Sequence, residues 1–196
     1  MTDAHQALLL KVRKVVDIKP AEESHLVEAF RPLKKKKNEL LIKKGDRVEN
    51  LFFVAIGFVR LFDVDESGNE NTKQLASRLD LISSFESFLN GEPATENLQC
   101  ISACTLLTIS KEDYKNLYQH VREWPAFCRS VYEDSILKMS RRIQALQSKT
   151  AEERYEQLIE TQADMALHVP VKYLASYLGI RPQSLSRIRN GQKSES

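Results

Sequence analysis

The sequence predicts an α+β chain in which a β-sandwich or barrel lies between helical segments. Helical periodicity runs through residues 4–32 and is interrupted near Pro20. Short strand-like runs broken by glycine turns fill residues 38–110. Helical periodicity then returns and continues towards the C-terminus. With 196 residues, of which 42% are hydrophobic and 29% charged, the chain has room for one large globular unit or two small ones.

The middle of the chain reads as several short strands. Turn-forming residues interrupt the apolar runs at Gly45, Gly57 and Gly68. The stretch LLTIS predicts one more strand, and the Ser110 that ends it precedes two acidic residues, as a helix N-cap does. We interpret the basic run at 34–37 as a solvated entry into the first strand rather than as a binding patch.

The segment 125–148 predicts the longest helix. It carries apolar residues at spacings of 4, 3, 4 and 3, which is the pattern of a coiled-coil seam. One interpretation is a seam between two copies of the chain, and the other is a stripe that packs on the chain's own core. We favour the dimer seam, whose residues are Tyr132, Ile136, Met139, Ile143 and Leu146.

A boundary follows the long helix. Thr150 and Glu153 have the spacing of a capping box, so a new helix begins there. The chain after it is too short to bury a large core by itself and must pack against the long helix or a partner. The expected units are therefore a strand-rich N-terminal domain, a dimerisation helix with its linker, and a C-terminal helical domain, at residues 1–124, 125–149 and 150–196.

The C-terminal segment predicts two short helices joined by a tight turn. Pro170 and Pro182 suit first helical positions, and Gly179 suits the left-handed backbone of a sharp turn. Ala175 is small where two crossed helices approach most closely. The apolar residues between them are Leu174, Leu178, Ile180, Leu185 and Ile188.

The second of these helices has the side chains of a DNA-reading helix. Gln183, Ser184 and Arg187 share the side opposite its apolar residues and are residue types that bind base edges. The plainer interpretation is a helical hairpin with an ordinary solvated face. The local charge favours DNA, because residues 170–196 carry +4 whereas 51–110 carry −5. The residues expected to contact phosphate are Lys172, Arg181, Ser186 and Arg189.

Three stretches together resemble the Crp/Fnr family of bacterial transcription regulators. KKGDRVENLFFVAIGFVRLF is similar to the family's first jelly-roll strands, and ISACTLLTISKEDYKNL to its last strand and following helix. KYLASYLGIRPQSLSRIRN is similar to its helix-turn-helix, and the ending LSRIR resembles a Bacteroidetes-type branch. The resemblance implies an N-terminal double-stranded β-helix (a jelly roll like that of cyclic-nucleotide-binding domains), a long dimerisation helix and a C-terminal all-α helix-turn-helix domain.

The sequence departs from the family at its ligand residues. Ligand-binding members carry a Gly-Glu pair for the ribose and an Arg-Ser pair for the cyclic phosphate. Those positions fall on Ser83-Ser84 and Ala94-Thr95 here, while Glu86 and Glu92 nearby would repel a phosphate. We therefore expect an effector other than cyclic AMP, or none.

Other parts of the family pattern are missing as well. No cysteine precedes Cys100, which argues against the family's iron–sulfur sensor. The family's β-wing is absent, and the ending GQKSES suggests a disordered tail. The DNA-reading run 182–187 differs from that of the cyclic-AMP-binding regulator, so the target sequence should differ too.

No enzyme class is indicated. The sequence has no phosphate-binding glycine loop, nucleophile elbow or zinc signature, and its four histidines lack metal spacing, so we expect no catalysis, no metal and no cofactor. No apolar run is long enough to span a bilayer, and the first residues lack a signal-peptide pattern. Three cysteines without close pairing fit buried thiols in a reducing cytoplasm.

These observations predict a cytoplasmic, homodimeric transcription regulator that binds an inverted repeat in double-stranded DNA. RNA polymerase and an unknown small-molecule effector are further candidate partners, and no membrane contact is expected. The alternative is a non-catalytic β-roll that docks a ligand or protein and carries a vestigial helix-turn-helix.

Overall fold

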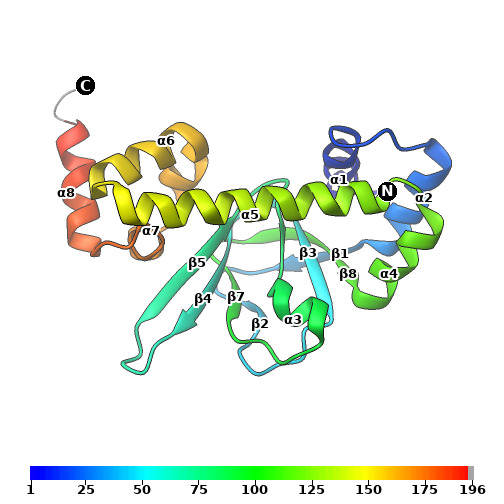
Figure 1. The fold of residues 1–196 in the computed structure, drawn as a ribbon, viewed down its shortest axis with the longest axis horizontal. Helices are drawn as coiled ribbons and strands as arrows, with labels where there is room; N and C mark the ends of the chain where they lie inside the picture. The colour runs from blue at the N-terminus through cyan, green and yellow to red at the C-terminus, as the bar shows by residue number, and fades with distance from the viewer. Residues whose placement is uncertain (194–196) are drawn as a thin grey trace.

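A β-sandwich, one long helix and a C-terminal helical unit make up the chain (Figure 1). The structure is a computed structural model and describes residues 1–193. The long helix α5 runs along the whole molecule, with the N-terminal helices at one end and α6–α8 at the other. None of the described helices is both long and apolar enough to cross a membrane.

The helices flank the strands in chain order. Two precede the sandwich, one short helix interrupts it, and five follow it. Their bounds are α1 Asp3–Arg13, α2 Pro20–Ala29, α3 Phe85–Asn90, α4 Lys111–His120, α5 Trp124–Ser148, α6 Ala151–His168, α7 Val171–Leu178 and α8 Pro182–Lys193.

Two four-stranded antiparallel sheets form the sandwich. One has the strand order β1-β8-β3-β6 and the other β2-β7-β4-β5. This is the predicted double-stranded β-helix, and it leaves β5 at the edge of the second sheet. The strands are β1 Arg31–Lys35, β2 Leu40–Ile42, β3 Asn50–Ile56, β4 Val59–Val64, β5 Glu70–Ala76, β6 Leu81–Ile82, β7 Asn97–Cys100 and β8 Cys104–Ser110.

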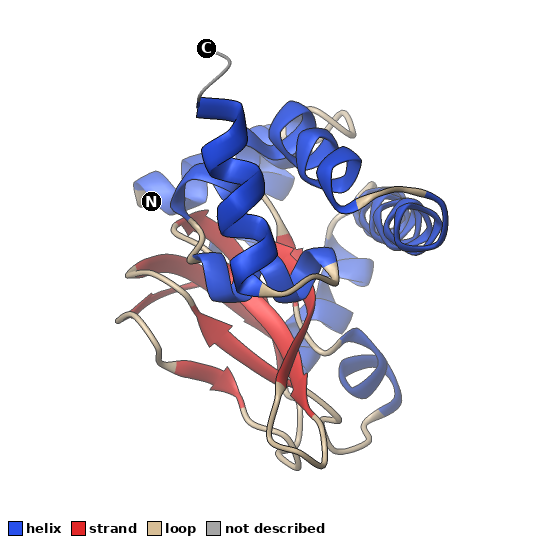
Figure 2. Cartoon of the chain, turned by 90° about the vertical axis from the view of Figure 1, so that its left-hand side faces the viewer, coloured by secondary structure: helices blue, strands red, loops and turns tan. Residues whose placement is uncertain are grey.

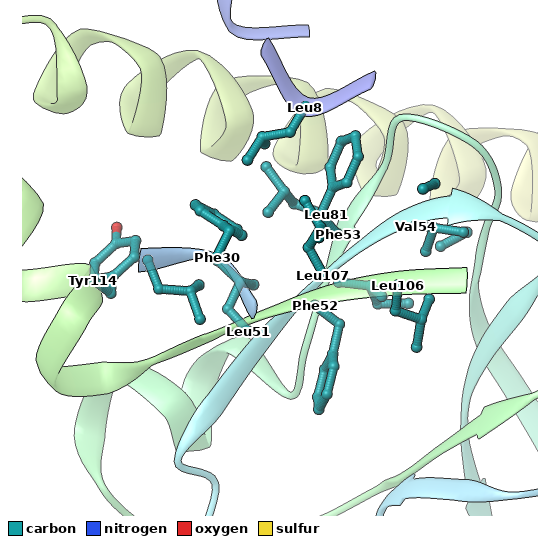
Figure 3. Close-up of a cluster of buried hydrophobic side chains, with 14 of the residues drawn as sticks. Leu8, Phe30, Leu51, Phe52, Phe53, Val54, Leu81, Leu106, Leu107 and Tyr114 are labelled. Carbon is teal, nitrogen blue, oxygen red and sulfur yellow. The ribbon is translucent and has the colours of Figure 1, made fainter. Parts of the chain in front are cut away.

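The core lies on both sides of the first sheet. Strand β3 is buried over five consecutive residues, so its sequence is uniformly apolar rather than alternating. Neighbouring residues point to opposite faces: Phe53 lies towards α1 and Leu8, and Phe52 points to the other side of the sheet (Figure 3). The helices on the first sheet are therefore part of the same core.

Local signals in the sequence explain most element boundaries. Ser110 accepts a hydrogen bond from the Asp113 amide at the start of α4, and Thr150 and Glu153 form the predicted capping box of α6. Gly179 ends α7 in the left-handed conformation, with φ at 67°. These predictions are confirmed.

Three expectations were wrong. Helix was expected up to residue 32, but Arg31–Lys35 form strand β1, because their backbone pairs with β8. Helix α3 was not predicted. The expected disordered tail from Gly191 is also wrong in part, since α8 extends to Lys193 and only 194–196 lie outside the described residues.

Gly57 tests how tightly the two sheets are joined. The backbone of Gly57 has a φ of +100°, and a Cβ added at this position would lie 2.6 Å from the Ala103 carbonyl oxygen. Gly68 has a similar φ of +82° but open space around it. We expect Gly57→Ala to lower the free energy of unfolding by about 2–4 kcal/mol, and Gly68→Ala by only about 1 kcal/mol. Urea denaturation of both variants measures the difference, and equal losses would contradict the packing described for Gly57.

Candidate nucleic-acid interface

Helices α7 and α8 cross around a small buried core. Ala175 and Leu185 are fully buried between them, and Ile188 is half-buried. The amide of Ile180 donates to the Ala175 carbonyl, which closes the turn at Gly179. The predicted helix-turn-helix geometry is therefore present, with its apolar residues inside.

Helix α8 lies at one end of the molecule (Figure 2). The polar residues on one side of it are exposed. Gln183 and Arg187 are exposed, and they lie one helical turn apart on one face. Ser186 is exposed on that same face, whereas Ser184 lies at its margin and is half-buried. The side chains best placed to reach a base are therefore Gln183 and Arg187.

The residues expected to contact phosphate fall into two groups. Arg181 and Ser186 are exposed. Lys172 instead forms an ion pair with Glu70 at 2.9 Å. Arg189 donates to the Tyr155 hydroxyl at 3.0 Å and to the Ala166 carbonyl. Both cations thus have partners within the chain, and contact of Lys172 and Arg189 with phosphate stays a prediction.

The helix-turn-helix unit is docked on the edge strand β5. The hydroxyl of Ser176 accepts a hydrogen bond from the Thr72 amide at 2.8 Å and donates to the Glu70 carbonyl at 3.0 Å. One side chain of α7 thus satisfies two backbone groups that a neighbouring strand would otherwise pair. The small apolar core of this unit extends onto the sandwich through Leu75 and Ile101.

A buried arginine lies at the centre of this contact. Arg60 is 1% exposed, and its guanidinium carbon lies 3.8 Å from the ring centre of Phe62 and 3.7 Å from that of Tyr173. It donates to Gln99 and, at 3.1 Å, to Glu70. Burial lowers the pKa of Arg60, and the charge of Glu70 opposes that shift. The stack joins β4 directly to α7.

The long helix holds the other side of α7. Arg142 donates to the carbonyl of Tyr177 at 3.0 Å and to that of Thr72 at 3.1 Å. Its guanidinium carbon lies 4.8 Å from the Tyr177 ring centre. Three elements, α5, α7 and β5, therefore meet at this one side chain.

The predicted dimer seam divides into two parts. Ile136, Met139 and Ile143 are 50–61% exposed and form an apolar stripe on α5. Tyr132 does not belong to it, because its hydroxyl bonds that of Tyr114 at 2.6 Å and its ring packs on Phe85. The place of Tyr132 in a seam between two copies stays a prediction.

Leu146 is also engaged within its own chain. Its Cδ2 lies 2.8 Å from where a Cβ on Gly179 would stand, so Leu146 packs against the turn of the helix-turn-helix. It remains 37% exposed, at the end of the stripe formed by Ile136, Met139 and Ile143.

The position of the family's ligand pairs is occupied by the chain itself. Ser84 caps α3 by position and donates to Glu96 at 2.8 Å. Glu96 forms an ion pair with Lys73 at 3.2 Å. The acid that repels a phosphate here is thus Glu96, whereas Glu86 and Glu92, which the sequence suggested, are exposed.

Sequence reasoning missed the residues that dock the helix-turn-helix on the sandwich. Arg60, Glu70, Ser176 and Arg142 come from four elements, and the Ser176–Glu70 bond joins residues 106 positions apart. The only available signal was an arginine within the apolar run FVRLF, where an unpaired charge would be costly.

Glu70 gives this docking a pH dependence. Burial raises the pKa of Glu70, but Lys172 and Arg60 outweigh burial and hold the pKa below its ordinary value. A lowered carboxyl pKa stabilises the folded state above the ordinary value of about 4.3, and this stabilisation is lost as the pH falls through the lower, folded value. We expect Glu70→Gln to reduce the free energy of unfolding by about 1 kcal/mol at neutral pH.

Denaturation of the Glu70→Gln variant and the unchanged protein from neutral to acid pH measures this effect. The difference should shrink as the pH falls below about 4. Glu66→Gln, at an exposed turn, is the control and should have no effect. A Glu70→Gln difference that is the same at acid and neutral pH would contradict the assignment.

Comparison with known proteins agrees with this architecture. Residues 32–121 match the cyclic nucleotide-binding domain family. The sequence matches none of the curated proteins compared with it.

Solved structures with the same fold extend over the rest of the chain. FixK2 from Bradyrhizobium japonicum has a TM-score of 0.72 at 15% identity and covers 85% of both chains. The c-di-GMP-responsive global regulator CLP from Xanthomonas campestris has a TM-score of 0.67 at 15% identity, covering 90% of this chain and 93% of its own. A protein from Eubacterium rectale, described as a transcriptional regulator of the Crp/Fnr family, has a TM-score of 0.67 at 14% identity, covering 90% and 84%.

The Bacteroidetes-type branch stays a prediction. The β-sandwich, the long helix and the helix-turn-helix follow one another here in the order that the resemblance implied. Residues 32–121 are similar in sequence to cyclic nucleotide-binding domains, and the chain shares its fold with FixK2 and with the Eubacterium rectale protein described as a Crp/Fnr regulator.

Proposed function

We propose that this protein is a sequence-specific transcription regulator that binds DNA as a homodimer. The observation that carries the proposal is the exposed face of α8, where Gln183 and Arg187 point outwards while Leu185 is buried beneath them. Arginine and glutamine make bidentate contacts with guanine and adenine in the major groove. In this proposal the protein binds DNA in the bacterial cytoplasm and catalyses no reaction.

The second part of the proposal is the dimer. Pairing of two α5 helices would bury the stripe of Ile136, Met139 and Ile143, and a strongly apolar stripe left in water is unfavourable. Twofold symmetry then places the two α8 helices in successive major grooves about 34 Å apart, which requires an inverted-repeat operator. RNA polymerase is a further partner in this proposal.

The effector in this proposal is unknown and is not cyclic AMP. Ser83, Ser84 and Ala94 are all at most 3% exposed, Ala94 replaces the family's phosphate-binding arginine, and Lys73 nearby is already paired with Glu96. CLP, described as c-di-GMP-responsive, has the same fold, so an effector other than cyclic AMP is compatible with this architecture.

The alternative function is a docking module with a vestigial helix-turn-helix. That alternative would be favoured if the reading face were buried against the rest of the chain. Gln183, Arg187 and Arg181 are instead exposed, which supports DNA binding.

Selection of genomic DNA fragments by the full chain, without added ligand and at physiological salt, tests the function directly. An enriched inverted repeat would support the proposal, including its independence from cyclic nucleotides. Failure to enrich any sequence, with and without cyclic AMP, would favour the docking alternative.

Arg187 should carry specificity. We expect Arg187→Ala to weaken binding to the selected operator by about 1–3 kcal/mol and to relax the preference at one base pair. Arg181→Ala should instead weaken binding to all sequences and lower the salt slope by about 1. Fluorescence anisotropy with operator and random DNA separates the two effects. Arg129→Ala, on an exposed part of α5, is the control, and equal losses on both DNAs for Arg187→Ala would contradict base reading.

The stripe on α5 predicts the oligomeric state. Ile136→Asp should weaken the dimer by more than about tenfold, because it places a charge in the seam. Leu137→Asp is a matched control, since Leu137 is 52% exposed and lies on another side of the same helix. Sedimentation equilibrium measures both variants. A dimer that tolerates Ile136→Asp, or that Leu137→Asp dissociates, would contradict the seam.

A further inference from the structure

A cavity of about 280 Å³ lies between the long helix and the C-terminal unit. Residues of α5 and α6 and the end of α7 surround it. Its charged and polar lining consists of Lys138, Arg141, Arg142, Arg154, Gln157, Thr161 and Gln162.

The cavity is strongly cationic. Four of its lining residues are cations, and no carboxylate is among the described residues that line it. Lys138 is neutralised from outside, by Asp80 at 3.0 Å and Asp134 at 2.9 Å. The three arginines remain.

The arginines of the cavity have no acidic partner in the part of the chain that the structure describes. Arg142 bonds only carbonyl oxygens, of Thr72 and Tyr177, and its pKa is lowered by burial. Arg154 donates through Nη1 to the Lys149 carbonyl at 2.7 Å, while its buried Nε has no hydrogen-bond partner among the described residues. A buried donor without a partner is costly, and it marks a place for an acceptor.

Apolar side chains line the same cavity, one helical turn after its arginines on α5 and α6. Ala145, Leu146, Leu158 and Leu178 line it, together with Tyr177. At Gln162, on the rim, α6 leaves helical geometry, with φ at −147° and ψ at 54°. A lining that combines cations with aliphatic side chains suits a ligand with an anionic group and an apolar body.

We propose that this cavity binds a small phosphate monoester that carries an apolar group. Guanidinium groups bind the oxygens of a phosphate through paired hydrogen bonds. The cavity has three arginines, which is more positive charge than a ligand with a single carboxylate would need. A DNA backbone fits less well, because it brings no apolar group to Leu146 and Leu158. The site is separate from the sandwich interior, where Glu96 lies.

The cavity stays open in the proposed dimer. Its α5 residues Lys138, Arg142 and Ala145 share one side of the helix, whereas Ile136, Met139 and Ile143 lie on average about 130° around it. Pairing through the apolar stripe therefore leaves the cavity accessible.

A ligand in this cavity would influence the position of the helix-turn-helix. It would contact α5 together with the end of α7, which Arg142 already joins. Any difference in ligand affinity between two arrangements of α7 changes the balance between them by the same free energy. Binding itself does not rest on the proposed DNA function, so it is measured without DNA.

Isothermal titration calorimetry of the full chain with phenyl phosphate, inorganic phosphate and phenol tests the site. We expect one phenyl phosphate per chain, bound at least about tenfold more tightly than inorganic phosphate, and no binding of phenol. Arg141→Gln and Arg154→Gln should each weaken phenyl phosphate by about tenfold or more. Arg129→Gln, an exposed arginine on the same helix, should leave binding unchanged.

Three results would overturn the proposal. One is the absence of saturable binding of phenyl phosphate up to about 10 mM. Another is equal affinity in the Arg141→Gln and Arg154→Gln variants, once thermal melting has shown that both fold. The third is a weaker salt dependence of DNA affinity in both variants, with a slope lower by about 1 each, together with no binding of phenyl phosphate. These arginines would then contact the DNA backbone.

Discussion

The contact between α7 and the edge strand β5 fixes the arrangement of the whole chain. Only Lys149 and Thr150 separate α5 from α6, and such a short connection does not define an angle by itself. Ser176 supplies the pairing that the strand lacks, Arg60 stacks between Phe62 and Tyr173, and Arg142 holds the end of α7. Without these contacts the direction of α8 would be undetermined.

The same contact limits which cations are available for DNA. Lys172 forms an ion pair with Glu70 at 2.9 Å. An ammonium that is already paired with a carboxylate gains less binding free energy from a phosphate than a solvated ammonium does. Arg189 is part of the small core around Tyr155. Some of the positive charges in segment 170–196 are therefore paired within the chain and are less available to DNA. The arrangement seen here and one in which Lys172 turns to a phosphate are alternatives, since one ammonium cannot fully satisfy both.

The sequence was informative wherever a local rule decides the structure. Capping at Ser110 and Thr150, the left-handed Gly179 and the apolar face of α8 all depend on residues within a few positions of one another. Non-local features were missed. Strand β1 forms from a sequence rich in lysine because β8 pairs with it, and Tyr132 lies apart from the exposed stripe because Tyr114 and Phe85 engage it. The candidate interface followed the same division: Gln183 and Arg187 were predictable from helical spacing, whereas the engagement of Lys172 and Arg189 depends on tertiary contacts.

The packing of α7 on β5 also affects the tendency of the chain to associate with other chains. An uncovered edge strand offers unpaired amide and carbonyl groups to any other chain and so promotes edge-to-edge association. Here Ser176 occupies two of those groups, and Tyr173 and Lys172 lie over the strand's beginning. A sandwich that loses α7 through proteolysis or truncation exposes Glu70–Ala76 and becomes a template for aggregation. The C-terminal helices would thus protect the solubility of the domain that precedes them, independently of the proposed function.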